Sequence, residues 1–148
     1  MSLESGTYII TNNAFKTLIG RNPFEDRSLL PKPVQSLPPG SDPPMWEILK
    51  TGSDYVMNIG GAPATEMDGL VSALLMDPEN GSKWCITPQP QHGPNVYTIE
   101  LADKSKGWVV PTEEPETQVA LQPLISTKSI PPQFPATQLF MIAPMNME

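Results

Sequence analysis

Proline interrupts this chain of 148 residues at nineteen positions, and ten glycines add further breaks. A proline lacks the N–H that a helix interior or a central strand needs, so these residues belong in turns and loops. The chain therefore has no room for long helices. Apolar, aromatic and β-branched residues are interleaved with the prolines, which argues against wholesale disorder. The pattern predicts short strands joined by many turns.

Two kinds of short segment occur three times each in the sequence. The first kind sets a tyrosine among β-branched or apolar residues: Gly6–Ile10, Ser53–Met57 and Asn95–Ile99. The second kind sets a large aromatic residue two positions before an isoleucine: Trp46–Ile48, Trp84–Ile86 and Phe140–Ile142. Residues two apart face the same side of a strand, so each of these pairs is expected to point into one core.

More strands are expected between each opening and each closing segment: Phe15–Ile19, Leu70–Leu75 and Gly107–Val110. A helical reading of Val71–Met76 is possible, but Pro78 ends that run early. Many short strands predict a sandwich or a barrel. Threefold repetition narrows this to an all-β fold, a β-trefoil with three four-stranded repeats forming a short closed barrel with a hairpin cap. The alternative is that the aromatic residues recur at this spacing by chance, in a β protein without threefold repeats.

We expect one domain over residues 1–148, with repeats at roughly 5–50, 51–91 and 92–148. The formal charge of −7 disfavours nucleic-acid partners and anionic membranes. The single cysteine, Cys85, lies in an apolar run and is expected to be a buried structural thiol. No secretory signal or membrane span is visible, so we expect a cytoplasmic protein, and nothing demands more than a monomer.

Signatures of catalysis are missing from the sequence. The single histidine, His92, lies between glutamine and glycine in an expected exposed turn, with no nucleophile elbow elsewhere. One histidine and one cysteine do not make a metal site, and Gly60-Gly61 lacks the rest of a nucleotide-binding motif. Adjacent acids in proline-rich loops are usually solvated. We therefore expect no enzyme, no cofactor and no metal.

The longest irregular stretches run from residue 21 to 45 and from residue 111 to 135, with single short strands expected around Val34 and over Thr117–Leu121. Loops of this length are often functional. The first stretch offers the chemistry of a substrate-like protease inhibitor, which needs a rigid extended loop and a side chain for the specificity pocket. Prolines on both sides of Arg27 supply stiffness, and the Arg27–Ser28 bond joins a basic residue to a small one.

Competing bonds in the same stretch are weaker candidates. The Arg21–Asn22 bond is the second choice, whereas a proline after Lys32 blocks attack on that bond. Asp26 counts against Arg27, because trypsin-like enzymes generally disfavour an acid directly before the basic residue. An arginine near acids is also often a simple surface ion-pair partner.

The chain resembles the cospin-type serine protease inhibitors of basidiomycete mushrooms. The resemblance spans nearly the whole chain, and its most specific part is Glu25-Asp26-Arg27-Ser28-Leu29-Leu30-Pro31-Lys32. Further matches include Gly61-Ala62-Pro63, Gly107-Trp108-Val109 and Pro131-Pro132-Gln133-Phe134-Pro135.

This resemblance implies a β-trefoil that inhibits trypsin-type serine proteases through the loop between its second and third strands, without catalysis or cofactor. Here that loop is residues 21–32, which we call the arginine loop. Carried over, Arg27 stands directly before the scissile bond and Ser28 directly after it, with Glu25, Asp26 and Leu29 as neighbours.

Two alternatives remain open at this stage. One is a carbohydrate-binding trefoil lectin, although the repeated aromatic residues lie in strand patterns that look buried. The other is inhibition of cysteine proteases through other loops, such as residues 58–68 with Gly60-Gly61.

Overall fold

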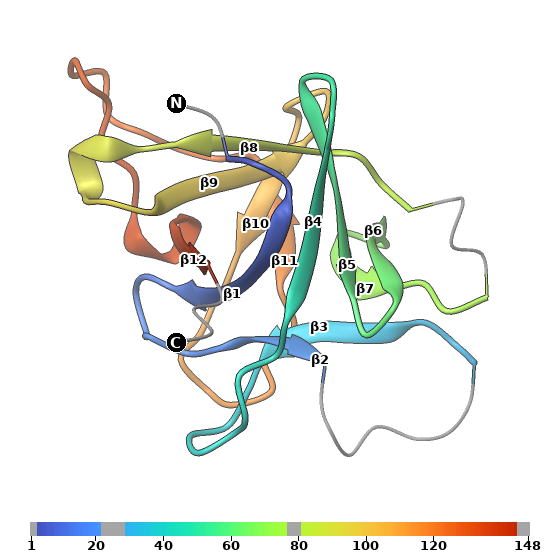
Figure 1. Ribbon diagram of the computed structural model, residues 1–148. Coiled ribbons are helices and arrows are strands. Elements are labelled where there is room, and N and C mark those ends of the chain that lie inside the picture. The colour runs from blue at the N-terminus through green and yellow to red at the C-terminus, as the bar shows by residue number, and fades with distance from the viewer. Residues whose placement is uncertain (1–2, 22–28, 77–80, 145–148) are drawn as a thin grey trace.

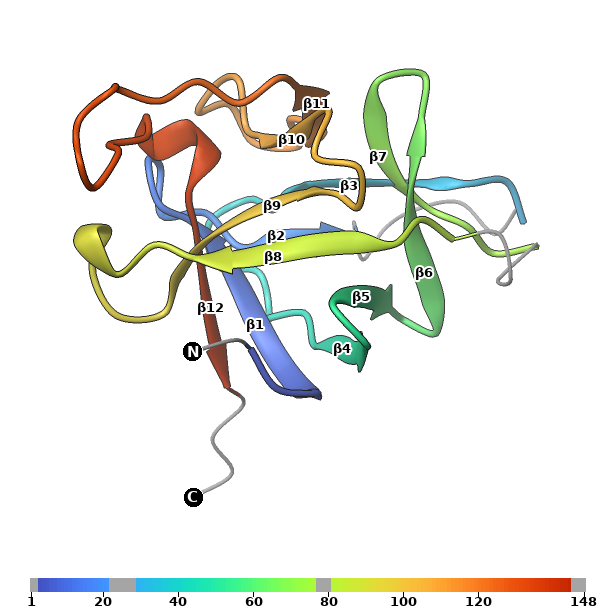
Figure 2. The ribbon, with the colours of Figure 1, turned by 90° about the horizontal axis from the view of Figure 1, so that it is seen from above.

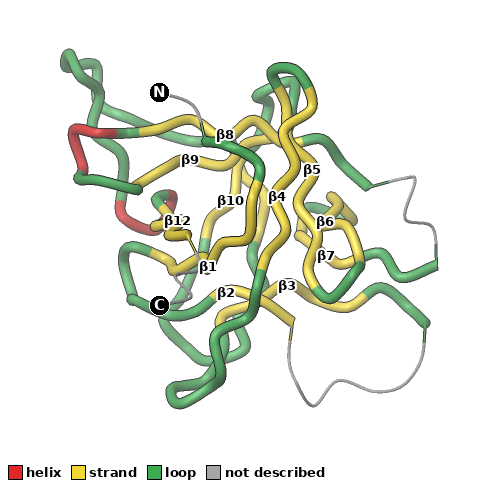
Figure 3. Tube along the Cα trace, in the orientation of Figure 1, coloured by secondary structure: helices red, strands yellow, loops and turns green. Residues whose placement is uncertain are grey.

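The computed structural model describes residues 3–21, 29–76 and 81–144. Figures 1 and 3 show a molecule built almost wholly from strands and loops. The strands are β1 (Gly6–Asn12), β2 (Ile19–Arg21), β3 (Lys32–Ser36), β4 (Trp46–Thr51), β5 (Asp54–Ile59), β6 (Ala62–Met67), β7 (Leu70–Ala73), β8 (Trp84–Pro88), β9 (Val96–Leu101), β10 (Gly107–Val109), β11 (Ala120–Gln122) and β12 (Phe140–Pro144). The described ranges also contain two short 3-10 helices, η2 (Pro90–His92) and η3 (Ala136–Gln138). No helix in the described ranges could cross a membrane.

Six of the strands form a closed ring. β1 pairs with β4, β4 with β5, β5 with β8, β8 with β9, β9 with β12, and β12 returns to β1, all antiparallel. The first and last strands of the chain thus lie side by side, with Tyr8 opposite Pro144. Closure leaves no free edge in this ring.

The remaining strands form three hairpins, β2–β3, β6–β7 and β10–β11, which contact one another. β7 pairs with β3 and with β11, and an isolated bridge between Gln35 and Gln118 joins the first hairpin to the third. The three hairpins therefore form a cap with threefold connections. A six-stranded barrel with such a cap is a β-trefoil, so the fold class predicted from the repeated segments is confirmed.

The repeated aromatic segments lie where the sequence predicts them. The three tyrosines of the opening segments lie in β1, β5 and β9, and the closing segments begin β4, β8 and β12. In each closing segment the aromatic residue and the isoleucine are buried, while the residue between them is exposed or half-buried. The middle residue of the second segment is Cys85, which is half-buried and not the buried thiol we expected.

Four strand predictions need correction at their ends. The strand expected from Phe15 begins only at Ile19, because Asn12 Oδ1 accepts the backbone N–H groups of Ala14 and Phe15 at 3.1 and 3.2 Å and holds a turn there. β7 and β10 end one or two residues earlier than predicted, and neither of them is helical. β11 begins three residues later than predicted, at Ala120.

Trp108 lies at the centre of the core. Its ring centroid is 5.7 Å from that of Trp46, 5.5 Å from that of Trp84 and 5.8 Å from that of Phe140. All four side chains are fully buried. The barrel strands β4, β8 and β12 and the cap strand β10 thus share one aromatic cluster.

Candidate functional site

The arginine loop joins β2 to β3 and is held at both ends by the cap. In the β2–β3 hairpin, Arg21 lies opposite Val34 and Ile19 opposite Ser36, and both Ile19 and Val34 are fully buried. Beyond the hairpin, the loop's far end is tied to β7, where Lys32 lies opposite Ala73. Both ends of the loop therefore start from rigid backbone.

Arg21 is anchored by its side chain as well as its backbone. Its Nη1 atom donates to the carbonyl oxygens of Ile59 and Gly60, at 3.2 and 3.3 Å. Gly60 has φ +60, and a Cβ atom there would lie 2.6 Å from Nη1 of Arg21. Only a glycine therefore lets the β5–β6 turn come this close to the guanidinium. The Arg21 side chain fastens the start of the arginine loop to the next hairpin.

The far end of the loop combines a buried lysine with exposed leucines. Lys32 is only 4% exposed, whereas Leu29 and Leu30 are 61% and 67% exposed. Large exposed apolar side chains on a soluble protein often mark an interaction surface. The loop thus exposes two leucines to solvent just before the chain returns to the cap at the buried Lys32.

Two of the seven predicted site residues, Arg21 and Leu29, belong to the described part of the chain. Asn22, Glu25, Asp26, Arg27 and Ser28 lie outside the described residues. Among the described residues, no group of His, Cys, Asp and Glu side chains could hold a metal ion.

The segment 58–68, considered as a second inhibitory loop, is mostly strand. β5 runs to Ile59 and β6 begins at Ala62, so the connection is the two-residue turn Gly60-Gly61, with positive φ at both positions. The first four residues of β6 are buried. A turn this short has little reach into the cleft of a protease.

The second long stretch contains a small closed loop at residues 127–133, which we call the lysine loop. It follows β11 and precedes η3, and Figure 3 shows it as irregular backbone. The N–H of Thr127 donates to the carbonyl oxygen of Gln133 at 2.9 Å, and the N–H of Gln133 donates back to Thr127 Oγ1 at 2.9 Å. This reciprocal pair closes the loop at its neck, and the Ile130–Pro131 peptide bond at its tip is cis.

Two residues of the 89–95 turn support the lysine loop from outside. Gln91 Nε2 donates to the carbonyl oxygen of Pro132 at 2.8 Å, and the N–H of Phe134 donates to His92 Nε2 at 3.1 Å. His92 is half-buried, so our expectation of an exposed turn residue is wrong. The rings of His92 and Phe134 are also in contact, with centroids 6.2 Å apart.

Residues 1–144 match the peptidase inhibitor family I66. The chain belongs to this family. Because the family is one of inhibitors, it agrees with the prediction that the chain is not an enzyme.

Relatives of this inhibitor family member cover nearly its whole length. A protein of Lentinula edodes named serine protease inhibitor is 42% identical over 142 residues, which is 95% of this chain and 97% of the relative. The solved structure of a proteinase inhibitor from Coprinopsis cinerea is 40% identical, covers 97% of this chain and 100% of its own, and superposes with a TM-score of 0.90. The resemblance to cospin-type inhibitors is confirmed.

Lectins share the fold of this inhibitor at low identity. The ricin B-like lectin of Macrolepiota procera is 17% identical, with a TM-score of 0.71 over 98% of this chain and 99% of its own. Shallow sugar sites generally need aromatic faces that are open to solvent. Within the described ranges every aromatic side chain is buried or half-buried. This likeness therefore shows the fold alone.

The residues that support the two loops from outside were not predicted from the sequence. Gly60 stood out only as half of a glycine pair, and Gln91 and His92 only as a polar turn. The loops they support lie 39 and 41 residues away along the chain. A single sequence carries no signal for such contacts unless the strand register is already known.

Proposed function

We propose that this chain is a reversible, substrate-like inhibitor of trypsin-like serine proteases, acting through the arginine loop with Arg27–Ser28 as the bond presented to the enzyme. Membership of the peptidase inhibitor family I66 carries the proposal. The relative named serine protease inhibitor supports the class of target. Because the basic side chain would enter an acidic pocket, trypsin-like enzymes are the best-matched members of that class.

Anchoring at both ends of the arginine loop supports a substrate-like mode of binding. A loop that is already held in place loses little conformational entropy when it enters a cleft. The buried Lys32 end and the tethered Arg21 end supply such support. The guanidinium of Arg27 would then form a charge-assisted, bidentate pair with an acid at the base of the specificity pocket.

Of the two arginines in the loop, Arg21 is poorly suited to enter a protease pocket. Its side chain is half-buried and its guanidinium donates to two carbonyl oxygens of the β5–β6 turn. Extraction of that side chain would break both hydrogen bonds, each worth about 1.5–3 kcal/mol when the donor is charged. This cost favours Arg27 as the residue before the scissile bond.

The test is the inhibition constant for trypsin of Arg27→Ala beside Arg27→Lys. We expect the alanine variant to weaken inhibition by the arginine loop by about 10²-fold or more, as loss of a central charged anchor does. The lysine variant keeps a charge for the pocket and should retain most of the affinity. Both should unfold at the wild-type temperature. If Arg27→Ala inhibits like wild type, the arginine loop is not the trypsin site.

A further inference from the structure

The single histidine of the chain takes part in a hydrogen bond that depends on its charge. The backbone N–H of Phe134 donates to His92 Nε2 at 3.1 Å. A backbone N–H can only donate, so Nε2 carries no proton and the neutral ring is protonated at Nδ1. Protonation of His92 would make both ring nitrogens donors and remove the acceptor. The bond therefore exists only while the imidazole is neutral.

The turn that carries His92 is fastened to the barrel by bonds that do not titrate. The N–H of His92 donates to the carbonyl oxygen of Gln89 at 3.0 Å, and the N–H of Gln89 donates to that of Val96 in β9 at 2.8 Å. Nε2 of the buried Gln89 side chain donates to Thr98 Oγ1 at 3.1 Å. Backbone amides, a side-chain amide and a hydroxyl do not change charge between pH 5 and 8. The turn therefore keeps its place on the barrel whatever the charge of His92.

The lysine loop is the side of this contact that is free to move. Residues 125–131 are all exposed. Figures 1 and 2 both place the turn between β8 and β9 beside the irregular segment that precedes β12. Among the described residues, the supports of the loop from this turn are the Gln91 side chain and the His92 ring. Loss of the His92 bond would leave Gln91 alone to hold the loop against the turn.

The segments around His92 offer no negative charge that would stabilise a positive ring. The turn 89–95 has no acid, and residues 117–147 contain no acid and one basic residue, Lys128. The centroid of the Phe134 ring is 6.2 Å from that of His92, beyond the roughly 6 Å within which a cation gains from an aromatic face. A protonated His92 would thus lose its hydrogen bond and gain no ion pair from these segments.

The strands that flank the turn do not supply such a charge either. The titratable groups of β8 and β9 are Cys85, Tyr97 and Glu100. Tyr97 lies opposite Pro88 next to the turn, and burial raises the pKa of its phenol, so it stays uncharged. Glu100 lies opposite Cys85, three residue pairs further along the two strands. At about 3.3 Å per residue, this puts it about 10 Å from the turn.

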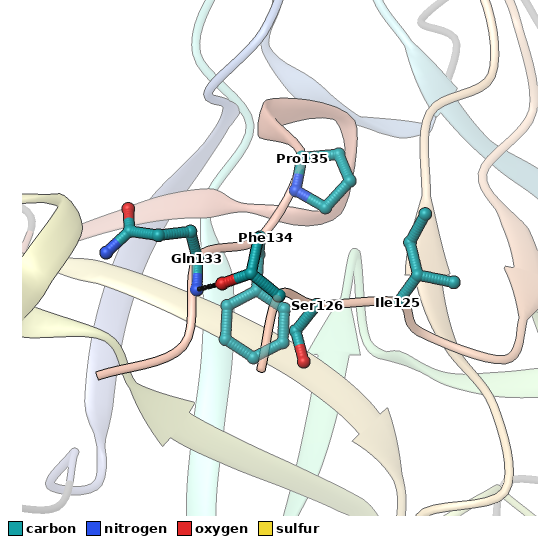
Figure 4. A pocket seen from close by; sticks show the side chains of 6 residues that line it. Ile125, Ser126, Gln133, Phe134 and Pro135 are labelled. Carbon is teal, nitrogen blue, oxygen red and sulfur yellow. Dashed lines mark hydrogen bonds between the residues drawn. The ribbon is translucent and has the colours of Figure 1, made fainter. Parts of the chain in front are cut away.

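Phe134 also links the bond to an apolar pocket of about 360 Å³. The pocket is lined by Ile125, Ser126, Thr127, Gln133, Phe134 and Pro135. Figure 4 shows the Phe134 ring among these side chains, at the neck of the lysine loop. The same residue thus forms a wall of the pocket and donates to His92. Movement of Phe134 away from the turn would therefore change the shape of the pocket.

We propose that His92 is a pH-sensitive latch on the lysine loop. While the ring is neutral, the bond to Phe134 is made and the loop is held against the turn. As the pH falls from about 8 to about 5, the range in which histidine takes up its proton, Nε2 binds a proton from solvent and becomes a donor. The bond is then lost, and Phe134 and the lysine loop separate from the turn. The latch goes beyond the proposed function of the arginine loop and does not depend on it.

NMR spectroscopy of the ¹⁵N-labelled chain tests the charge dependence directly, because the one histidine makes the imidazole signals unambiguous. At pH 8 we expect a scalar coupling across the hydrogen bond, between the Phe134 amide nitrogen and His92 Nε2. The ring should then be protonated at Nδ1 alone. At pH 5 the coupling should be lost and both ring nitrogens should be protonated. A ring that stays neutral at pH 5, or a coupling that persists there, would overturn the proposal.

Hydrogen exchange measures the opening of the loop itself. Protection of the Phe134 amide, corrected for the intrinsic exchange rate at each pH, should fall by about tenfold or more between pH 8 and pH 5. The Thr127 amide at the neck should lose protection with it. Amides of β1 and β4 should keep theirs, which shows that the barrel stays folded. Equal protection of Phe134 at the two pH values would contradict the latch.

Two variants assign the pH effect to His92. His92→Phe keeps a ring beside Phe134 but can neither accept the N–H nor take up a proton, so protection of Phe134 should be low at both pH values. Gln91→Ala is the matched control, because it removes the neighbouring support and leaves His92 in place. Its protection should be lower at both pH values, with the pH-dependent step of the wild type retained.

The two variants also give the result that would sink the idea. A step of wild-type size in His92→Phe would assign the pH effect to another group. Loss of the step in Gln91→Ala would likewise show that His92 alone does not control the loop. Thermal unfolding of both variants near the wild-type temperature at pH 8 excludes misfolding as the cause.

Discussion

The three buried tryptophans allow the energetic contribution of an indole hydrogen bond to be measured separately from that of burying the side chain. Nε1 of Trp46 donates to the carbonyl oxygen of Ile19 at 2.8 Å, and Nε1 of Trp84 donates to that of Ala64 at 3.1 Å. Nε1 of Trp108 has no partner among the described residues, although all three side chains are 0% exposed. Replacement by phenylalanine removes the same atoms at each position.

The expected difference follows from those contacts. Trp46→Phe leaves the Ile19 carbonyl without its donor, and an unsatisfied buried group costs about 1–3 kcal/mol. Trp108→Phe breaks no hydrogen bond and removes an N–H whose burial is itself unfavourable. The loss of packed volume is similar in both. We therefore expect Trp46→Phe to lower the free energy of unfolding by about 2 kcal/mol more than Trp108→Phe.

Urea unfolding followed by far-UV circular dichroism is the assay, because fluorescence would change with the tryptophans themselves. The free energy is taken from the midpoint and slope, and an unchanged slope shows that the unfolded state is comparable. For a chain of this size the difference corresponds to about 4–8 °C in melting temperature. Trp84→Phe should fall between the other two. An equal loss for Trp46→Phe and Trp108→Phe would refute the reasoning and show that volume alone decides.

Three further changes test the loop supports and the barrel. Gly60→Ala and Gly61→Ala should each lower the free energy of unfolding by about 1–2 kcal/mol, because alanine is strained at a positive φ. Only Gly60→Ala displaces Arg21, so only this variant should also weaken trypsin inhibition. Burial raises the pKa of Glu100, so its charged form destabilises the fold; Glu100→Gln should be more stable than wild type in urea at pH 7, with the gain absent below pH 4.5. Gln91→Ala should speed cleavage of the lysine loop in peptide mapping and leave the unfolding temperature nearly unchanged.

The fold was accessible from the sequence because its signal is repeated and local. An aromatic residue and an isoleucine two positions apart must share a face of a strand, and all three such pairs are buried. The same periodicity also predicts that the residue between them points away from the core. Our expectation of a buried Cys85 ignored this alternation and followed the hydrophobic character of its neighbours.

The errors in strand ends have a different cause. Phe15 is apolar and lies next to a β-branched run, yet the Asn12 side chain captures the backbone N–H groups that a strand would use. Segment 58–68 carries a glycine pair that reads equally well as a loop or as a tight hairpin turn. Only the register of β5 against β6 distinguishes the two. Such choices depend on partners that are distant in sequence.

Pairing of β1 with β12 brings the two ends of the described chain together, with Tyr8 opposite Pro144. A short peptide linker between the ends would therefore not strain the barrel, and backbone cyclisation is feasible. A circular chain offers no starting point to exopeptidases. New ends could then be opened elsewhere on the surface, so that a chosen surface loop could be cut or kept in a permuted molecule.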